Sequence, residues 1–406
     1  MNNQTQPIAG NAPLYWLALG TFAVGTESFM IAGLLPGMAA DLSVSIATAG
    51  QLVTVFAFAY ALSSPVLTAL TGSFNRRNLL IFSMIAFALA NLVAWSAHSY
   101  WALMGARILL AFSAGIYVPG ANALAGVVAG PERRGTAIAI VNGGISIAIA
   151  LGVPLGALIG DRLCWRMTFA GVAALAALAI AGLLWGLPRG IGAGLPTATL
   201  KERINTARQP AILLTLLVTT LWAMGAYTIY TYLALFIASA THLHGAQIGS
   251  VLFMWGVAAA LGVIVGGHAI DKFGARAVIL PCLVICMVAF MTLSASAHWL
   301  GKSLALVPIF VAVVAWGIAH WAFYPAQQTN LIGIAGLRIT PIALSLNASF
   351  MYLGFSLGAA LGSLTLTYLA VGDLGWVAAL CEGAALLLAV SISARVEAAH
   401  RSAVPA

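Results

Sequence analysis

Few ionisable side chains stand well inside the long apolar runs of this sequence, and these are Glu27, Arg107 and Glu382. A carboxyl group in such a run can bind and release a proton, whereas a guanidinium group stays charged. Burial favours the neutral form of Glu27, and a neighbouring Arg107 favours its charged form. We therefore predict that Glu27 is the proton carrier. It would form an alternating pair with Arg107, binding a proton in one state and pairing with Arg107 in the other.

A static ion pair that holds two helices together is the alternative for Glu27 and Arg107, because buried ion pairs often serve structure alone. For Glu382, which comes early in the last apolar run, we expect an interfacial or bracing role. A charged side chain at the centre of a membrane helix costs roughly 2.5–3.5 kcal/mol on insertion, so such residues face the bundle interior or a water-filled cavity.

Polar and aromatic side chains also recur along single helix faces. Trp316, His320 and Tyr324 are spaced four apart, and Gln327 continues the stripe. A largely apolar pocket with a few hydrogen-bonding groups suits drug-like molecules. The alternative is that the aromatic rings anchor helices at the membrane interface and that the histidine only hydrogen-bonds a neighbouring helix. We predict a substrate cavity lined by Gln51, Asn142, Tyr227, Tyr230, Trp316, His320, Tyr324 and Asn347.

Other chemistry has little support in the sequence. There is no Ser-His-Asp arrangement, HExxH motif or acidic cluster, so we expect no enzyme, no metal site and no cofactor. His242 and His244 lack a nearby third ligand, and the sequence Gly301-Lys302-Ser303 lacks the upstream glycine of a nucleotide-binding loop. These features exclude an ATP-driven pump.

The elements that position these residues follow from composition. Of 406 residues, 62% are apolar and only 6% are charged, against about 25% in a soluble domain. Only helices and closed barrels span lipid, and the apolar runs are continuous, which favours helices. We predict an all-α integral membrane protein with twelve transmembrane helices, near 13–36, 47–71, 78–98, 100–123, 135–160, 165–187, 210–238, 246–269, 276–296, 302–325, 342–368 and 372–393.

The basic residues predict the orientation, because Lys and Arg accumulate in cytoplasmic loops. With the N-terminus inside, the outer loops hold only Arg162, Arg166 and Lys302. We predict a multi-pass protein of the cell (inner) membrane with both termini cytoplasmic and no nucleic-acid partner, the net charge of +8 being explained by topology and anionic lipid. The inner loops and tail would hold Arg76, Arg77, Arg133, Arg134, Arg189, Lys201, Arg203, Arg208, Lys272, Arg276, Arg338, Arg395 and Arg401.

The chain also divides into two similar halves. We predict a six-helix bundle over 1–187, a cytoplasmic linker over 188–209 and a second bundle with a short tail over 210–406. The motif LGVPLGAL in the first half returns as LGAALGSL in the second, each followed by Gly-Asp and then Trp. Parallel six-helix repeats place a binding site at their interface near the membrane midplane, which is a transporter architecture.

The stretch 267–276 carries a family resemblance. Gly267, Asp271, Lys272, Gly274 and Arg276 match the inner-loop signature of the major facilitator superfamily, which implies a cytoplasmic gating motif with a tight turn at the second glycine. The first-half loop departs from the signature, with glycine and asparagine where aspartate and glycine are expected. It keeps Arg76 and Arg77.

Further stretches resemble the drug:proton antiporter branch of that family. Gly152, Pro154 and Gly156 resemble its fifth-helix antiporter motif, although Val153 interrupts the usual Gly-Pro pair. Arg107 resembles the fourth-helix arginine of the branch. The runs 25–36 and 49–52 look like bacterial arabinose or sugar efflux and chloramphenicol resistance permeases.

The resemblance implies two pseudo-symmetric six-helix bundles and a proton-coupled secondary transporter. We expect an antiporter that exports small amphiphilic drug-like molecules by alternating access, with a small-molecule substrate, protons and membrane lipid as its partners. We expect a monomer. A dedicated sugar or nucleoside efflux permease is the nearest alternative, and a non-transporting receptor or a membrane enzyme is a more distant one.

Overall fold

The computed structural model describes residues 11–130, 133–189, 191 and 198–403. Within these residues the chain has twelve helices that are long and apolar enough to cross a membrane, and no strand. This confirms the prediction of an all-α membrane protein. The chain forms two compact units, Met1–Leu200 and Lys201–Ala406, so the boundary between them falls inside the stretch 188–209.

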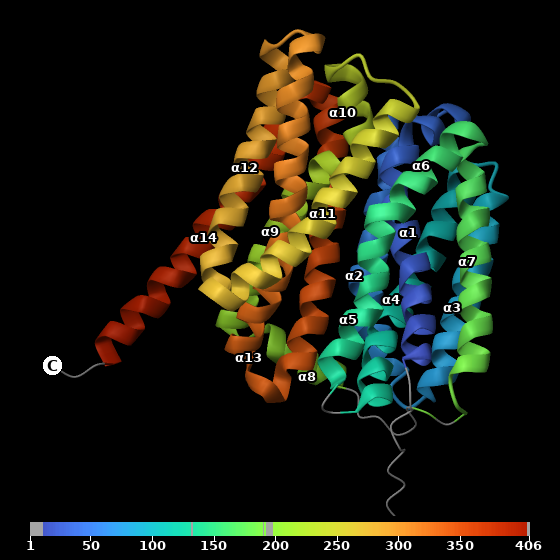
Figure 1. Ribbon diagram of the computed structural model, residues 1–406, viewed down its shortest axis with the longest axis vertical. Helices are drawn as coiled ribbons and strands as arrows, with labels where there is room; N and C mark the ends of the chain where they lie inside the picture. Colours follow the sequence, from blue (N-terminus) through green and yellow to red (C-terminus); the bar gives the residue numbers. More distant parts are fainter. Residues whose placement is uncertain (1–10, 131–132, 190, 192–197, 404–406) are drawn as a thin grey trace, which may run out of the picture. The chain divides into compact units, whose positions relative to one another are not determined.

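The N-terminal unit is built of long helices that run side by side, drawn from blue to green in Figure 1. Helix α1 packs against α5, α6 and α7 and is the most buried of them, while α4 packs against α2 and α3. The helices are α1 (Ala12–Asp41), α2 (Ile46–Leu70), α3 (Arg76–Trp95), α4 (Tyr100–Ala129), α5 (Arg134–Ile147), a π-helix (Ala148–Gly152), α6 (Val153–Arg162) and α7 (Trp165–Gly186).

The π-helix ends at Gly152, two residues before Pro154, inside a single membrane span that runs over Gly135–Arg162. Proline has no N–H to donate and its ring crowds the preceding turn, so an α-helix cannot continue undisturbed through it. A wider π turn is a common local solution. The predicted antiporter motif therefore lies at an irregular point of its helix.

Glycines on this span allow α1 to approach closely. A Cβ atom added at Gly152 would lie 2.2 Å from Thr26 Oγ1, and one at Gly156 would lie 3.0 Å from Met30 Cβ. Small residues at such spacing let helix backbones come together where a larger side chain would hold them apart. The motif residues thus fix the packing of α1.

The C-terminal unit contains the remaining helices, drawn from light green to red in Figure 1. Helix α9 packs against α13 and α14, and α12 packs against α13 and α14. The elements are α8 (Leu200–Ala207), α9 (Pro210–Tyr230), α10 (Leu233–Ala240), α11 (Ala246–Phe273), α12 (Ala275–Trp299), α13 (Lys302–Tyr368), a 3-10 helix (Val371–Asp373) and α14 (Leu374–Ala403).

Three predicted spans of this unit differ in their bounds from the observed helices. The runs 302–325 and 342–368 belong to α13, whose backbone is helical on both sides of a break at Gly336 with φ of 70°. The run 210–238 is divided between α9 and α10 by Thr231 and Tyr232. Apolar runs mark the part of a helix that lies in lipid, and backbone hydrogen bonds continue beyond it wherever no residue interrupts them.

Candidate functional site

Glu27 of α1 and Arg107 of α4 form a buried ion pair in the N-terminal unit. Both side chains are 0% exposed, and Arg107 Nη1 donates a hydrogen bond to Glu27 Oε1. Arg107 Nε donates to the carbonyl oxygen of Leu52 at 3.2 Å, and its guanidinium carbon lies 4.1 Å from the ring centre of Phe56. Helices α1, α2 and α4 therefore meet at one charge pair.

The two charges of this site are held unequally. Arg107 has the carboxylate, a carbonyl oxygen and an aromatic face, each of which stabilises a cation. Glu27 Oε2 is buried and accepts no hydrogen bond from any described residue. A carboxyl oxygen in that position is able to take up a proton, whereas the guanidinium cannot release one. The structure thus brings together the two predicted residues. Their contacts leave Glu27 able to take up and release a proton while Arg107 stays charged.

Phe56 and Leu52 were not predicted as parts of this site. They lie four residues apart on α2 and so share one face of that helix. Gln51, a predicted cavity residue, is the neighbour of Leu52 in the chain and is half-buried. The sequence has no signal for the contribution of Leu52, because its contact is made by a backbone carbonyl group.

Asn142, the other predicted cavity residue of the N-terminal unit, lies on α5. Its side-chain Oδ1 accepts a hydrogen bond of 3.1 Å from Asn122 Nδ2 on α4. The pair links α4, which carries Arg107, with the helix that leads into the predicted antiporter motif. Asn142 is therefore tied to its neighbour helix in this structure.

The predicted aromatic residues of the C-terminal unit lie around α9 in two groups of contacting rings, one at Trp222 and one at Tyr230. The ring of Trp222 stacks on His320 at 4.0 Å and on Phe323 at 4.6 Å between ring centres. Trp316 is 0% exposed and lies 6.3 Å from Tyr230. His320 is 1% exposed. Trp316 and His320 are therefore core residues as well as members of the predicted stripe.

Two further predicted residues belong to these groups, Tyr227 to that of Tyr230 and Tyr324 to that of Trp222. The ring of Tyr227 lies 3.7 Å from that of Phe355 and 5.3 Å from that of Tyr230, centre to centre. Tyr324 is half-buried and stacks at 6.2 Å over Trp222. Trp222 was missed by sequence analysis, although it lies eight residues before Tyr230 and hence on the same face of α9.

A polar network crosses the same unit. Thr219 Oγ1 donates to Asn347 Oδ1 at 2.8 Å and accepts from Gln327 Nε2 at 3.1 Å. Gln327 Nε2 also donates to the carbonyl oxygen of Thr215 at 2.8 Å. The network joins α9 to both arms of α13. Asn347 and Gln327 thus contact the same threonine side chain, and the two threonines were not predicted.

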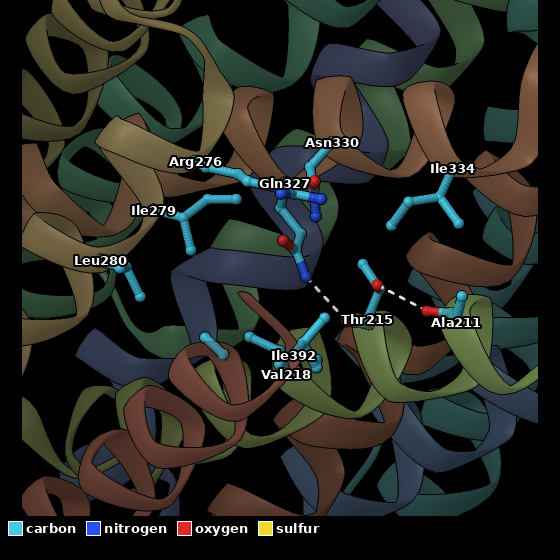
Figure 2. Close-up of a pocket in the computed structure, with 11 residues that line it drawn as sticks. Ala211, Thr215, Val218, Arg276, Ile279, Leu280, Gln327, Asn330, Ile334 and Ile392 are labelled. Atoms are coloured by element: carbon cyan, nitrogen blue, oxygen red, sulfur yellow. Dashed lines mark hydrogen bonds between the residues drawn. The ribbon is translucent and has the colours of Figure 1, made fainter. Parts of the chain in front are cut away.

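Figure 2 shows a pocket in the C-terminal unit. Helices α9, α12, α13 and α14 surround it, and its polar side chains are Thr215, Arg276, Gln327 and Asn330. None of the eight predicted cavity residues lines it. Its other lining residues are Ala211, Val218, Ile279, Leu280, Ile334, Ala389 and Ile392.

The predicted gating loop forms the tight turn that its glycine suggested. Helix α11 ends at Phe273, α12 begins at Ala275, and Gly274 between them has φ of 82° and ψ of 159°. Asp271, Lys272 and Arg276 are exposed, and Gly267 is half-buried within α11. Among the described residues neither Asp271 nor Arg276 forms an ion pair.

The corresponding arginines of the N-terminal unit are buried instead. Arg77 Nε donates to the carbonyl oxygen of Leu187 at 2.8 Å, and its Nη2 donates to that of Leu184 at 2.7 Å. A cation at the last carbonyl groups of a helix satisfies acceptors that have no partner within it. Arg77 therefore caps the end of α7, while Arg76 is 4% exposed at the start of α3.

Comparison with known proteins identifies the family. The profile of the Major Facilitator Superfamily matches residues 17–331 and 215–405. The inner membrane transport protein YdhP of Escherichia coli (strain K12) is 32% identical over 391 residues, covering 95% of this chain and 96% of that protein. The uncharacterized MFS-type transporter YbcL of Bacillus subtilis (strain 168) is 31% identical over 367 residues, covering 90% and 92%.

A chloramphenicol resistance protein of Streptomyces lividans is 32% identical over 277 residues, which cover 67% of this chain and 71% of that protein. Among solved structures, the peptide transporter POT in complex with sulfate has a TM-score of 0.75 and 13% identity, covering 95% of this chain and 94% of that one. This likeness shows the fold. The chain belongs to the Major Facilitator Superfamily and is a multi-pass transporter of the inner membrane.

Proposed function

We propose that this transporter exchanges protons for small amphiphilic, drug-like molecules and exports them by alternating access. The observation that carries the proposal is the buried pair of Glu27 and Arg107, with its one unpartnered carboxylate oxygen. An ionisable residue within a membrane bundle is costly and is usually functional. The likeness to a chloramphenicol resistance protein supports export of a drug-like substrate.

The coupling step is proton binding at Glu27. Protonation removes the negative charge of the carboxylate and so weakens its attraction to Arg107, which keeps its contacts with Leu52 and Phe56 on α2. Helix α1 is then freer to move relative to α4. Because Gly152 and Gly156 pack directly on α1, a shift of α1 reaches the antiporter motif around Pro154.

The remaining roles follow from the sequence expectations. The substrate cavity is formed by the eight polar and aromatic residues from Gln51 to Asn347, whose rings and amides suit an amphiphilic molecule. The loop with Asp271 and Arg276 gates the cytoplasmic side together with the arginines at 76 and 77. The chain acts as a monomer, with six-helix bundles over 1–187 and 210–406, a cytoplasmic linker over 188–209, and both termini in the cytoplasm.

The free energy released when one proton crosses the membrane is sufficient to drive such an antiporter. One elementary charge that crosses 100 mV yields roughly 2.3 kcal/mol, and about 1.4 kcal/mol corresponds to a tenfold ratio of concentrations. One proton therefore sustains a substrate gradient of some tens-fold.

The proposal is tested with the full chain reconstituted in proteoliposomes. Chloramphenicol, a dye, a sugar and a nucleoside are offered as radiolabelled or fluorescent probes, with and without an imposed pH gradient. We expect gradient-driven movement of chloramphenicol or the dye. Movement of the sugar or nucleoside alone would favour the dedicated permease, and movement that ignores the gradient would refute proton coupling.

A further inference from the structure

Glu382 on α14 is a second buried carboxyl group, and its surroundings differ from those of Glu27. Its side chain is 0% exposed, and neither Oε1 nor Oε2 has a hydrogen-bond partner among the described residues. It lies in a notch of α9, where a Cβ atom added at Gly225 would be 3.2 Å from Glu382 Cγ and from Oε1. This is not the bracing role that the sequence suggested, because the side chain holds no partner.

The groups that face Glu382 are uncharged. Cys282 and Cys286 of α12 and Cys381 of α14 lie within electrostatic range of it, and α9 contributes Gly225. No ion pair joins it to a basic side chain in the part of the chain that the structure describes. An unpaired carboxylate in such surroundings would be far more costly than a neutral acid. These surroundings therefore favour the neutral, protonated form of Glu382.

More distant charged and titratable groups lie at the two ends of the seam, which is the interface that α9, α12 and α14 share. At one end, exposed Arg276 of α12 lines the pocket of Figure 2 together with the uncharged Gln327 and Asn330 of α13. At the other end, His298 of α12 pairs with Asp373 of the 3-10 helix at 3.1 Å.

The pocket and Glu382 share three helices. Val218, Ile279 and Ala389 line the pocket on α9, α12 and α14. Each lies seven residues along its helix from a residue at the carboxyl site, namely Gly225, Cys286 and Glu382. Seven residues of an α-helix rise about 10.5 Å. The pocket is therefore about two helical turns from the carboxyl group, on the side of the Arg276 end, and its polar side chains suit bound water.

We propose that Glu382 is a second proton-binding carboxyl of this transporter and that it exchanges its proton with water through the Arg276 pocket. Its part in transport rests on the proposed proton coupling, whereas its proton binding does not. The neutral acid fits the dry notch at Gly225. Opening of the seam between α9, α12 and α14 would admit water from the pocket and allow the proton to leave.

Infrared spectroscopy of the full chain in lipid vesicles tests the proton directly. A protonated carboxyl has its own C=O stretching band, and that band shifts when the O–H proton is replaced by deuterium from D2O. We expect a band that is absent in Glu382→Gln and present in Glu27→Gln, and that shifts in D2O. Gln has the shape of the neutral acid, so the variant should fold, and Glu382→Met is a second uncharged variant.

Asn330→Leu tests the route, since it replaces a polar pocket side chain by an apolar one of similar size and leaves the carboxyl site untouched. We expect deuterium exchange at Glu382 to slow at least several-fold in this variant. The control Asp161→Asn changes an exposed side chain of the N-terminal unit and should leave the exchange rate unaltered. A missing Glu382 band, or a band that never shifts in D2O, overturns the proposal. Exchange that is equally fast in Asn330→Leu overturns the route.

A transport measurement then separates this inference from the proposed function. The number of protons exchanged per molecule of chloramphenicol is measured for wild type and Glu382→Gln. We expect a lower number in the variant, and an unchanged number overturns the role of Glu382 in coupling. If wild type shows no pH-driven transport but the Glu382 band exchanges, the proposed function fails and the proton site stands.

Discussion

Arg107 and Glu27 are unequal partners, although they form one ion pair. A lone buried carboxylate can take up a proton and become neutral, whereas a lone guanidinium stays charged. The contacts of Arg107 with the Leu52 carbonyl and the Phe56 ring compensate only part of that charge. Removing either partner should therefore have different consequences.

We predict that Glu27→Gln destabilises the protein more than Arg107→Met does. Leaving a buried charge without its partner costs about 3–5 kcal/mol, whereas a neutral acid without hydrogen bonds costs about 1–3 kcal/mol. Thermal unfolding in detergent measures the difference, and the double variant should recover part of the loss. Equal destabilisation by the two single variants would contradict this prediction. It would show that a charged Arg107 without Glu27 is no more costly than a neutral Glu27 without Arg107.

At the scale of residues, the sequence predicts best those residue types that are rare in membrane helices. Glu27 and Arg107 could be predicted because few ionisable side chains lie within apolar runs. Phe56 and Trp222 could not, because aromatic residues are common in membrane helices, and only the crossing of α2 with α4, or of α9 with α13, brings them to a charge or a histidine ring.

Among the helices, the close contact of α1 with the predicted antiporter motif is made by glycine. We predict that Gly152→Ala destabilises the N-terminal unit by about 1–3 kcal/mol, the usual effect of overpacking, because its Cβ would meet Thr26 Oγ1 at 2.2 Å. Thermal unfolding measures this. Thr26→Ala should rescue part of the loss. Gly143→Ala is the matched control, with no atom within 4 Å of its added Cβ.

The turn between α11 and α12 provides a test of backbone conformation alone. Gly274 has positive φ but no atom within 4 Å of an added Cβ, so space is not limiting there. We predict that Gly274→Ala lowers stability by about 1–3 kcal/mol, the cost of a conformation that is nearly confined to glycine. Gly267→Ala in α11, also with open space, should be neutral or stabilising because alanine favours helix. Similar unfolding curves for the two variants would contradict this.

The helices themselves were predictable from hydropathy, but some of their ends were not. Runs of apolar residues located twelve spans, since lipid requires them. They could not show that α13 continues through polar residues to the break at Gly336, because there the backbone is held by its own hydrogen bonds and not by lipid. The π-helix before Pro154 likewise follows from one missing N–H and not from the hydrophobic pattern.

At the scale of the whole molecule, the distribution of the basic residues predicts the orientation of the chain in the membrane. Thirteen Lys and Arg fall on one predicted side and three on the other, with Arg107 inside a span. We predict that a fluorescent protein fused after Ala406 is fluorescent in cells, since it folds in the cytoplasm and not when exported to the periplasm. A fusion in the loop 163–164 should be dark, and the reverse pattern would contradict the orientation.

In the proposed mechanism, the buried carboxyl group of Glu27 couples proton movement to export. The most direct measurement is pH-driven chloramphenicol flux in proteoliposomes that contain equal amounts of folded wild type, Glu27→Gln and Asp161→Asn. Wild type and Asp161→Asn, which lacks only an exposed carboxylate, should respond to the pH gradient, and Glu27→Gln should not. A gradient response that survives in Glu27→Gln would remove this residue from the mechanism.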